Sequence, residues 1–250
     1  CINLGCVPKK IMWYGAQIAE SIQQYGPDYG FTSTGVNFNF STLRKNREAY
    51  IDRARSSYEG SFKRNGVDLI EGRAEFVDAH TLSVNGELFH AKHIVIATGA
   101  HPHIPAIPGA ELGGSSDDVF AWEELPESIA ILGAGYIAVE LAGVLHTLGV
   151  QTDLFVRRER PLRGFDSYIV ESLVQEMENT GLNLHTHKVP AKLEETEQGI
   201  TIHFEDGSTH TASQVIWATG RRPNVEGLQL EKVGVTLNER GFIQVDEYQN

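Results

Sequence analysis

Residues 129–143 read IAILGAGYIAVELAG, and this stretch decides the fold. An apolar run of strand length precedes Gly133, and apolar residues at helical spacing follow Gly135. Gly133 permits a tight turn, Gly135 leaves room for a phosphate against the backbone, and the small Ala138 lets helix and strand pack closely. A bare G-x-G-x-x-A pattern is weak evidence, and a tight turn without a ligand is the alternative. Between a strand and a helix, the pattern predicts a dinucleotide site at the helix N-terminus.

The strand that follows helps to identify the nucleotide. It ends in DLFV (153–156), Arg157 comes next, and Arg163 lies one loop further on. A site for NAD usually has an acidic residue where Arg157 stands, whereas guanidinium groups form charge-assisted hydrogen bonds with a 2′-phosphate. We therefore expect NADPH, with a solvated basic loop as the alternative.

Strands and helices are predicted on both sides of this motif. Alternation of the two from about residue 128 onward predicts an α/β fold with a parallel, doubly wound sheet. In that part we expect strands at 128–132, 152–156 and 214–220, helices at 135–148 and 166–180 with Asp166 as cap and Gly181 as stop, and short alternating strands over 188–213. Before it we expect helices at 9–24 and 41–64, strands at 67–70, 73–77, 81–84, 87–90 and 93–97, and a hairpin turn at Asn85-Gly86.

Composition narrows the class of protein. The chain of 250 residues is 41% hydrophobic and 22% charged, as soluble globular proteins are, and its formal net charge is −12. Its Lys and Arg residues form no long basic stripe, so we expect no nucleic-acid partner. No apolar run approaches the ~18–20 residues that cross a bilayer, so we expect no membrane association.

Both cysteines fall within the first six residues. Cys1 and Cys6 are followed by Pro8, which suits a first helical turn, and by Lys9 and Lys10, whose positive charge favours a thiolate. Such a pair could cycle between dithiol and disulfide. Two unconnected buried cysteines, or half of a zinc site, are the alternatives. Zinc would need two further ligands, and since no second cysteine pair exists we expect no metal site.

These motifs together resemble a known family. CINLGCVPKK (1–10) is similar to the active-site segment of the pyridine nucleotide–disulfide oxidoreductases, specifically the CVNVGCVPKK form of the glutathione-reducing subfamily. GAGYIAVELAG (133–143), the Arg157 and Arg163 pair, WATGRRPN (217–224) and VDEYQN (245–250) are also similar and occur in the family's order. The resemblance implies an oxidoreductase in which NADPH reduces FAD, and FAD reduces a disulfide that acts on glutathione disulfide.

The resemblance also implies roles for individual residues. Cys6 would be the sulfur nearest the flavin, and Cys1 the interchange thiol that attacks glutathione disulfide. Lys9 matches a lysine near the flavin, and Glu140 matches the glutamate that pairs with it. Tyr58 matches a tyrosine that contacts glutathione, although its position alone suggests ordinary packing.

Further positions are expected to bind the two cofactors. Tyr136 would cover the nicotinamide pocket and move aside for NADPH, with a packed aromatic as an equal alternative. Ala74 matches a residue near the FAD adenosine. The full set of expected cofactor-binding residues is Lys9, Ala74, Thr98, Gly99, Gly133, Ala134, Gly135, Tyr136, Ile137, Ala138, Glu140, Arg157, Arg163 and Gly220.

The family pattern predicts how the chain is divided. We expect two Rossmann-like domains, each with a small antiparallel meander: an FAD-binding domain over 1–118, an NADPH-binding domain over 119–240, and a return to the first over 241–250. The family's first FAD motif, later Gly-Asp motif and C-terminal interface domain find no match here. We therefore expect an internal fragment that alone does not reduce glutathione disulfide, from an intact protein that is a cytoplasmic homodimer.

Other members of the family are weaker matches. Dihydrolipoamide dehydrogenases usually have Ser where Lys9 stands and an acidic residue where Arg157 stands. The extra cysteines of mercuric reductases would fall outside this chain. Trypanothione reductases share the CVNVGCVPKK form and stay open, although Ser57 and Ser61 beside Tyr58 make no strong case for a bulkier polyamine conjugate. A module that binds NADPH without turnover is the alternative from another class.

Overall fold

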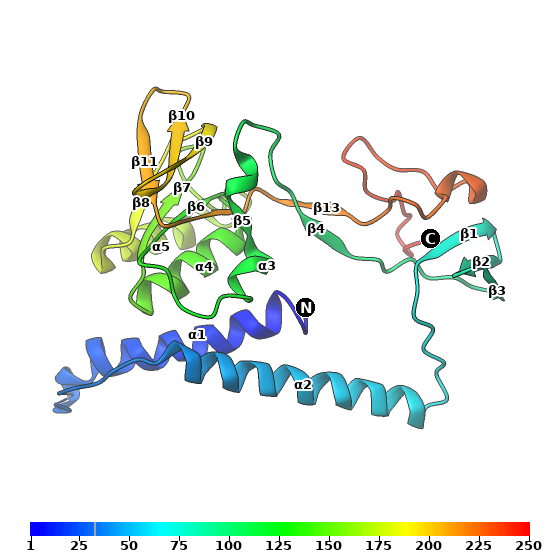
Figure 1. Ribbon diagram of the computed structural model, residues 1–250, viewed down its shortest axis with the longest axis horizontal. Coiled ribbons are helices and arrows are strands. Elements are labelled where there is room, and N and C mark those ends of the chain that lie inside the picture. Colours follow the sequence, from blue (N-terminus) through cyan, green and yellow to red (C-terminus); the bar gives the residue numbers. More distant parts are fainter. Residues whose placement is uncertain (33) are drawn as a thin grey trace. The chain divides into compact units, whose positions relative to one another are not determined.

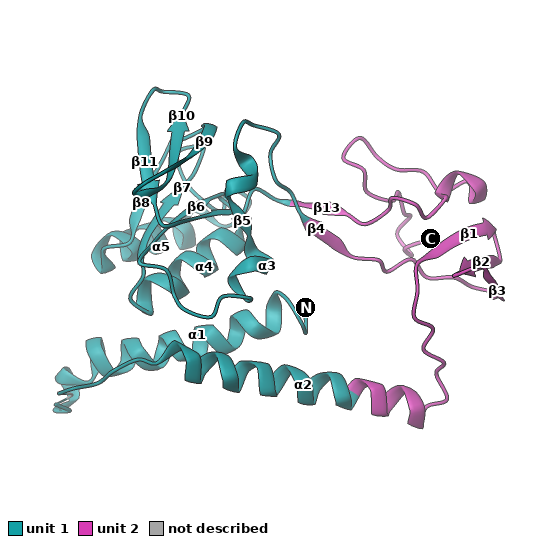
Figure 2. Ribbon diagram, viewed as in Figure 1, with its two compact units in different colours: residues 1–57, 102–220 teal, residues 58–101, 221–250 magenta. Residues whose placement is uncertain are grey.

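The computed structural model describes residues 1–32 and 34–250, and its internal contacts divide the chain into two compact units (Figure 2). The first unit consists of residues 1–57 and 102–220, and the second of residues 58–101 and 221–250. The α/β class expected from the sequence is confirmed by a parallel sheet with helices in the first unit. The domain borders expected at 118 and 240 stay a prediction.

A five-stranded parallel sheet lies at the centre of the first unit (Figure 1). Its order is β5-β12-β6-β7-β8, and every neighbouring pair is parallel. The strands are β5 (Gly114–Ser115), β6 (Ser128–Leu132), β7 (Gln151–Phe155), β8 (Asn183–His185) and β12 (Gln214–Trp217). Nearly every residue of β6 is buried, as expected for a parallel strand covered on both faces. The three strands expected near 128, 152 and 214 are thus confirmed.

Helices pack against one face of this sheet. The helices are α1 (Cys6–Glu20), α3 (Ser116–Val119), α4 (Tyr136–Thr147), α5 (Ser167–Thr180) and α2 (Phe40–Arg64), which runs on into the second unit. Met12 of α1, Leu141 of α4 and Ile131 of β6 share one core. Asp166 caps α5 by accepting a hydrogen bond of 3.0 Å from the Tyr168 N–H. Gly181 ends the helix at φ 81, so both expected signals are confirmed.

An antiparallel meander of order β11-β10-β9 packs against the sheet through a second core. Its strands are β9 (Pro190–Thr196), β10 (Gly199–Phe204) and β11 (Thr209–Ala212), which confirms the alternating strands expected over 188–213. Phe204 of the meander stacks on Phe155 of β7 with ring centroids 5.0 Å apart. Trp217 is buried in the same core and donates a hydrogen bond of 2.8 Å to the carbonyl of Ala110, in the 3-10 turn η3 (Ala110–Leu112).

The first two helices differ from the prediction at their boundaries. The helix predicted over 9–24 is α1, which begins earlier, at Cys6, and ends at Glu20; the helix predicted over 41–64 is α2, which begins one residue earlier, at Phe40. After α1, the chain continues through a π-helical turn, η1 (Ser21–Tyr25), and a 3-10 turn, η2 (Pro27–Tyr29). Arg47 of α2 is fully buried and donates a hydrogen bond of 2.6 Å to the carbonyl of Phe120. Its guanidinium also pairs with Glu48 at 2.7 Å, which offsets the cost of burying the charge. None of the described helices is long and apolar enough to cross a membrane.

The second unit contains a smaller antiparallel sheet of order β1-β2-β3. Its elements are β1 (Ala74–Asp78), β2 (Thr81–Val84), β3 (Glu87–His90), the paired strands β4 (Ala100–Pro102) and β13 (Arg221–Pro223), and the turn η4 (Leu230–Val233). Asn85 and Gly86 have φ values of 54° and 86°, which confirms the predicted hairpin turn. Phe76, Leu228 and Leu230 form its small core.

Two predicted strands of the second unit are wrong. Residues 67–70 and 93–97 have the apolar composition of strands but form none. A strand exists only where a neighbour completes its hydrogen bonds, and the described part of the chain pairs neither segment with one. The side chains of Leu69 and Val95 are accordingly 63% and 86% exposed.

Candidate redox and nucleotide site

The glycine turn lies at the carboxyl edge of the parallel sheet, between β6 and α4. The Gly133 N–H donates a hydrogen bond of 3.0 Å to the carbonyl of Phe155, at the end of β7. A Cβ at Gly133 would overlap the carbonyl oxygen of Ala218, so only glycine fits there. A Cβ at Gly135 would meet nothing within 4 Å. The turn is therefore tightly packed at its first glycine and open at its second.

The N-terminus of α4 presents the remaining motif residues. Gly135 is its N-cap and makes no side-chain capping bond, so side chains leave the first N–H groups of the helix free for an anion. Ala138 is fully buried, which lets α4 approach the sheet. Tyr136 is 57% exposed, so the structure does not show the packed aromatic that was its alternative. Gly220 lies three residues after the end of β12, at φ 128. Ala134 of the turn and Ile137 of α4 are half-buried.

The arginine loop after β7, residues 157–163, is attached to the glycine turn by a main-chain hydrogen bond. Arg157 and Arg163 are both exposed. Between them, the Leu162 N–H donates a hydrogen bond of 2.7 Å to the carbonyl of Ala134 in the turn. Glu159 lies in the same loop; its own backbone N–H, then Arg158 and Arg160, hold the pKa of its carboxyl below the ordinary value. The loop thus presents two exposed guanidinium groups beside the open turn.

The two cysteines form a disulfide at the start of α1. Cys1 and Cys6 are bonded, their Cα atoms are 4.7 Å apart, and both residues are exposed. The unconnected-cysteine alternative is therefore wrong. The Cys1 carbonyl accepts a hydrogen bond of 2.9 Å from the Val7 N–H, and Gly5 takes φ 101 to make the turn. No cluster of metal-binding side chains occurs among the described residues.

A lysine three residues after Cys6 joins the disulfide helix to the nucleotide helix. Lys9 Nζ on α1 lies 2.5 Å from Glu140 Oε1 on α4. The Lys9 side chain is 22% exposed and that of Glu140 is 42% exposed. Lys10 instead lies over the ring of Trp13, 3.5 Å from its centroid. Of the two adjacent lysines, only Lys9 is paired with Glu140.

Two more of the expected cofactor residues line a pocket in the second unit. It has a volume of about 420 Å³ and is lined in part by Ala74 and Thr98. Asn224 holds this region: its carbonyl accepts a bond of 2.6 Å from the Thr98 hydroxyl, and its N–H donates one of 2.9 Å to the carbonyl of Gly99. Tyr58, on the part of α2 in this unit, is 54% exposed. Asn224 was not assigned from the sequence, although it ends the WATGRRPN motif.

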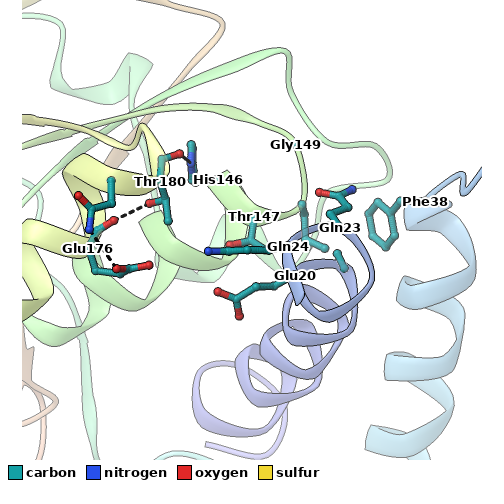
Figure 3. Close-up of a pocket in the computed structure, with 12 residues that line it drawn as sticks. Glu20, Gln23, Gln24, Phe38, His146, Thr147, Gly149, Glu176 and Thr180 are labelled. Atoms are coloured by element: carbon teal, nitrogen blue, oxygen red, sulfur yellow. Dashed lines mark hydrogen bonds between the residues drawn. The ribbon is translucent and has the colours of Figure 1, made fainter. Parts of the chain in front are cut away.

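A second pocket, in the first unit, contains none of the expected site residues. It has a volume of about 490 Å³ and lies by the carboxyl ends of α4 and α5 (Figure 3). There His146 Nε2 is 2.9 Å from the carbonyl oxygen of Thr180, and the Thr180 hydroxyl donates a bond of 2.8 Å to the carbonyl of Glu176. These polar groups are already partnered within the chain, so the pocket carries no further assignment.

Sequence reasoning also missed a buried carboxylate next to the arginine loop. Asp153 on β7 is 4% exposed and pairs with His185 at 2.7 Å and His210 at 3.6 Å. Burial lowers the pKa of His210. The charge of Asp153 acts against this lowering, and that of His185 adds to it. The available signal was a lone acidic residue inside the apolar strand TDLFV.

Comparisons with known proteins agree with this geometry. The family model described as pyridine nucleotide-disulphide oxidoreductase matches residues 1–250. Glutathione reductase from Schizosaccharomyces pombe is 40% identical over 259 aligned residues, which cover 100% of this chain and 56% of that protein. Glutathione reductase from Yarrowia lipolytica is 38% identical over 267 aligned residues, which cover 100% of this chain and 57% of that protein.

One solved structure has the same fold at lower identity. The HOCl-induced flavoprotein disulfide reductase RclA from Escherichia coli is 26% identical and superposes with a TM-score of 0.86. The superposition covers 98% of this chain and 53% of that one. The chain therefore spans little more than half the length of these relatives.

Proposed function

Because the chain belongs to the pyridine nucleotide-disulphide oxidoreductase family, we propose that the intact protein reduces glutathione disulfide with electrons from NADPH. Two relatives named glutathione reductase, 40% and 38% identical, support this substrate. The observation that carries the proposal is the 2.5 Å ion pair between Lys9 and Glu140. It joins the helix that begins at a disulfide to the helix that begins at an open glycine turn.

The nucleotide would be held at the carboxyl edge of the parallel sheet. The open space at Gly135 and the uncapped N-terminus of α4 fit a pyrophosphate. Arg157 and Arg163 would bind a 2′-phosphate through charge-assisted hydrogen bonds. Tyr136 and Gly220 would lie toward the nicotinamide. When bound, NADPH would supply a hydride and FAD would provide the route by which its electron pair reaches the disulfide.

Each unit carries residues that match FAD-binding positions of the family. In the second unit, the pocket lined by Ala74 and Thr98 offers space for the adenosine, and Asn224 keeps Thr98 and Gly99 in place. In the first unit, the Lys9 ammonium would stabilise negative charge on the reduced flavin, and Glu140 would orient that ammonium. Both assignments follow from the family match residue by residue.

Disulfide exchange would be carried out by the two sulfurs in sequence. In the reduced state, the Cys1 thiolate attacks one sulfur of glutathione disulfide, forms a mixed disulfide and releases one glutathione thiolate. The Cys6 thiolate then attacks the Cys1 sulfur, releases the second glutathione and re-forms the Cys1–Cys6 bond. Cys6 is the first residue of α1, where the helix N-terminus favours a thiolate. Tyr58 would contact the glutathione.

The setting of the reaction follows from its chemistry. A dithiol couple kept reduced by NADPH suits the cytosol, where glutathione is held largely in its thiol form. We infer that location and, from the family match, a homodimer for the intact protein. Cys1 and Cys6 are used for redox chemistry in this proposal, and no metal is required.

Turnover by the intact protein tests the proposal. NADPH oxidation is followed with glutathione disulfide or trypanothione disulfide as oxidant, in the parent and in Cys1→Ser and Cys6→Ser. We expect reduction of glutathione disulfide by the parent and loss of at least about 1,000-fold in each variant, because each sulfur forms a covalent intermediate. Unchanged turnover in either variant would refute the redox role. A preference for trypanothione disulfide would change the substrate, and NADPH binding without flavin reduction would indicate a non-catalytic module.

A further inference from the structure

A buried carboxylate lies in β7, a strand whose last four residues are all buried. Asp153 is 4% exposed, whereas its neighbours Leu154 and Phe155 belong to the hydrophobic cores of the first unit. Burying a carboxylate costs several kcal/mol unless the charge is paired and hydrogen-bonded. Packing alone does not call for this residue, because an aliphatic side chain would fill the site without that cost.

Two imidazoles meet this carboxylate, one from the adjoining strand β8 and one from β11 of the meander. His185 Nε2, at the end of β8, is 2.7 Å from Asp153 Oδ1, and His210 Nε2, on β11, is 3.6 Å from Oδ2. The His185 ring also stacks on Phe155, with centroids 4.4 Å apart and planes 9° from parallel. The His185 side chain is therefore held by a hydrogen bond at its edge and an aromatic ring on its face.

The backbone of His185 in turn holds the segment that carries Arg157. The Val156 N–H donates a hydrogen bond of 2.8 Å to the His185 carbonyl. Three residues after His185, the Lys188 N–H donates a hydrogen bond of 3.0 Å to the Val156 carbonyl, and the His187 N–H donates one of 3.2 Å to the Arg158 carbonyl. Arg157 therefore lies between two residues whose main chains are both fastened to the segment 185–188.

That attachment uses an unfavourable backbone conformation. His187 has φ 56, a left-handed value that costs a non-glycine residue about 1 kcal/mol or more. Such a conformation persists where surrounding contacts determine it. On the other side of the loop, the bond from the Leu162 N–H to the carbonyl of Ala134 completes the attachment.

We propose that Asp153 and His185 are a positioning pair for Arg157, so that the preference for a 2′-phosphorylated nucleotide depends on two side chains that do not touch it. The inference rests on the proposed NADPH site and adds to it the residues that set its selectivity. A guanidinium binds a phosphate through directed, paired hydrogen bonds, so a small shift of its backbone weakens them. NADH has no phosphate at this position and is insensitive to that shift.

Nucleotide binding to the 250-residue chain tests the proposal. Calorimetry gives Kd values for NADPH and NADH in the parent, Asp153→Ala, His185→Phe and His185→Gln. Asp153→Ala removes the acceptor, and His185→Phe keeps a stacked ring without a donor. In His185→Gln, the amide N–H replaces imidazole Nε2–H. We expect the first two to lower the NADPH preference about tenfold with the Kd for NADH unchanged, and His185→Gln to retain it.

Matched controls separate this inference from the proposed function. Arg157→Ala should abolish the preference, and His203→Gln, which alters a half-exposed histidine 3.2 Å from Glu194, should leave it unchanged. A parent chain without NADPH preference would refute the proposed cofactor. A parent preference that Arg157→Ala removes but that both Asp153→Ala and His185→Phe retain would refute the positioning pair alone. Variants that weaken the binding of NADPH and of NADH equally would also refute the positioning pair, because equal loss indicates a purely structural role. If Asp153→Ala does not fold, the contrast between His185→Phe and His185→Gln decides.

Discussion

The two units treat the same kind of apolar segment differently. In the first unit, residues 128–132 and 214–217 pair on both sides as β6 and β12, and Ile129 and Val215 have no exposed surface. In the second unit, residues 93–97 have the same composition but form no strand, and Val95 is 86% exposed. Apolar composition therefore specifies where a strand can form, and a neighbouring strand decides whether it does.

The largest expected effect on stability is at the glycine turn between β6 and α4, in the first unit. Gly133→Ala places a Cβ against the carbonyl oxygen of Ala218, and we expect it to destabilise the first unit by about 3–5 kcal/mol. Gly135→Ala adds its Cβ to open space at φ −87, so it should cost less than about 1 kcal/mol. Urea unfolding followed by circular dichroism measures both.

Nucleotide affinity distinguishes the two glycines in a second way. The Cβ of Gly135→Ala would occupy the space proposed for the pyrophosphate, so the folded variant should bind NADPH at least about tenfold more weakly. If Gly133→Ala is as stable as the parent, the close approach of turn and β12 is not what makes glycine necessary there. If Gly135→Ala binds NADPH normally, the pyrophosphate does not lie at this turn.

Core truncation compares the two units directly. Leu141 on α4 is 1% exposed, and we expect Leu141→Ala to cost about 3 kcal/mol, because it leaves a cavity under the sheet. Val95→Ala removes methyl groups that already face solvent and should change the free energy of unfolding by less than about 0.5 kcal/mol. Hydrogen exchange resolved by segment reports each change. A large effect of Val95→Ala would mean that the Val95 side chain is packed in solution.

Features determined by residues near one another in sequence could be predicted. The G-A-G turn, the Asp166 cap and the Asn85-Gly86 hairpin are local, because the residues that form each one are neighbours in the chain. The strand at 93–97 failed because its pairing depends on residues elsewhere. The strand predicted at 67–70 is wrong for the same reason, because no neighbouring strand pairs with it in the described part of the chain.

The same distinction between local motifs and long-range contacts applies to the candidate site. Cys1, Cys6, Gly133 and Gly135 stand in short motifs, and their arrangement follows from the turn that each motif forms. The pairing of Lys9 with Glu140 spans more than a hundred residues and was expected only through the family resemblance. Asp153 and His185 belong to no motif; their contact arises where β7 and β8 pair in parallel, which periodicity alone does not specify.

A smaller effect is expected where a contact between elements can be compared with one inside a helix. Lys9→Met breaks the ion pair from α1 to α4, and Lys10→Met removes a cation–π contact with Trp13 within α1. Both pairs are partly exposed, so each variant should cost less than about 1 kcal/mol. The Lys9 effect should shrink as salt rises from 0.05 to 0.5 M, roughly as screening predicts. Equal salt dependence in both variants would show that the contact between α1 and α4 contributes no specific charge interaction.

The smallest expected effect compares a turn from each antiparallel meander. Asp206, between β10 and β11, accepts bonds from Lys188 Nζ at 2.7 Å and from Ser208, and these lower the pKa of its carboxyl well below the usual range. In the second unit, the His80 backbone N–H and the Thr81 hydroxyl lower the pKa of Asp78. Because the folded-state pKa is depressed, each carboxylate stabilises the fold at pH values above 3.8, the ordinary pKa of an aspartate. That stabilisation is lost as pH falls through the lower folded value.

Carboxyl-carbon NMR titration from pH 6 to pH 2 distinguishes the two turns. Asp206 should protonate at lower pH than Asp78, and its midpoint should rise with added salt because an ammonium is one of its partners. The midpoint of Asp78 should depend less on salt, since an N–H and a hydroxyl are its main partners and the charges of His90 and His80 contribute less. Lys188→Met should raise the pKa of Asp206 toward that of Asp78, while Thr81→Val should raise only that of Asp78. Identical salt dependence at both positions would contradict the assignment of Lys188 as the charge partner in the first unit.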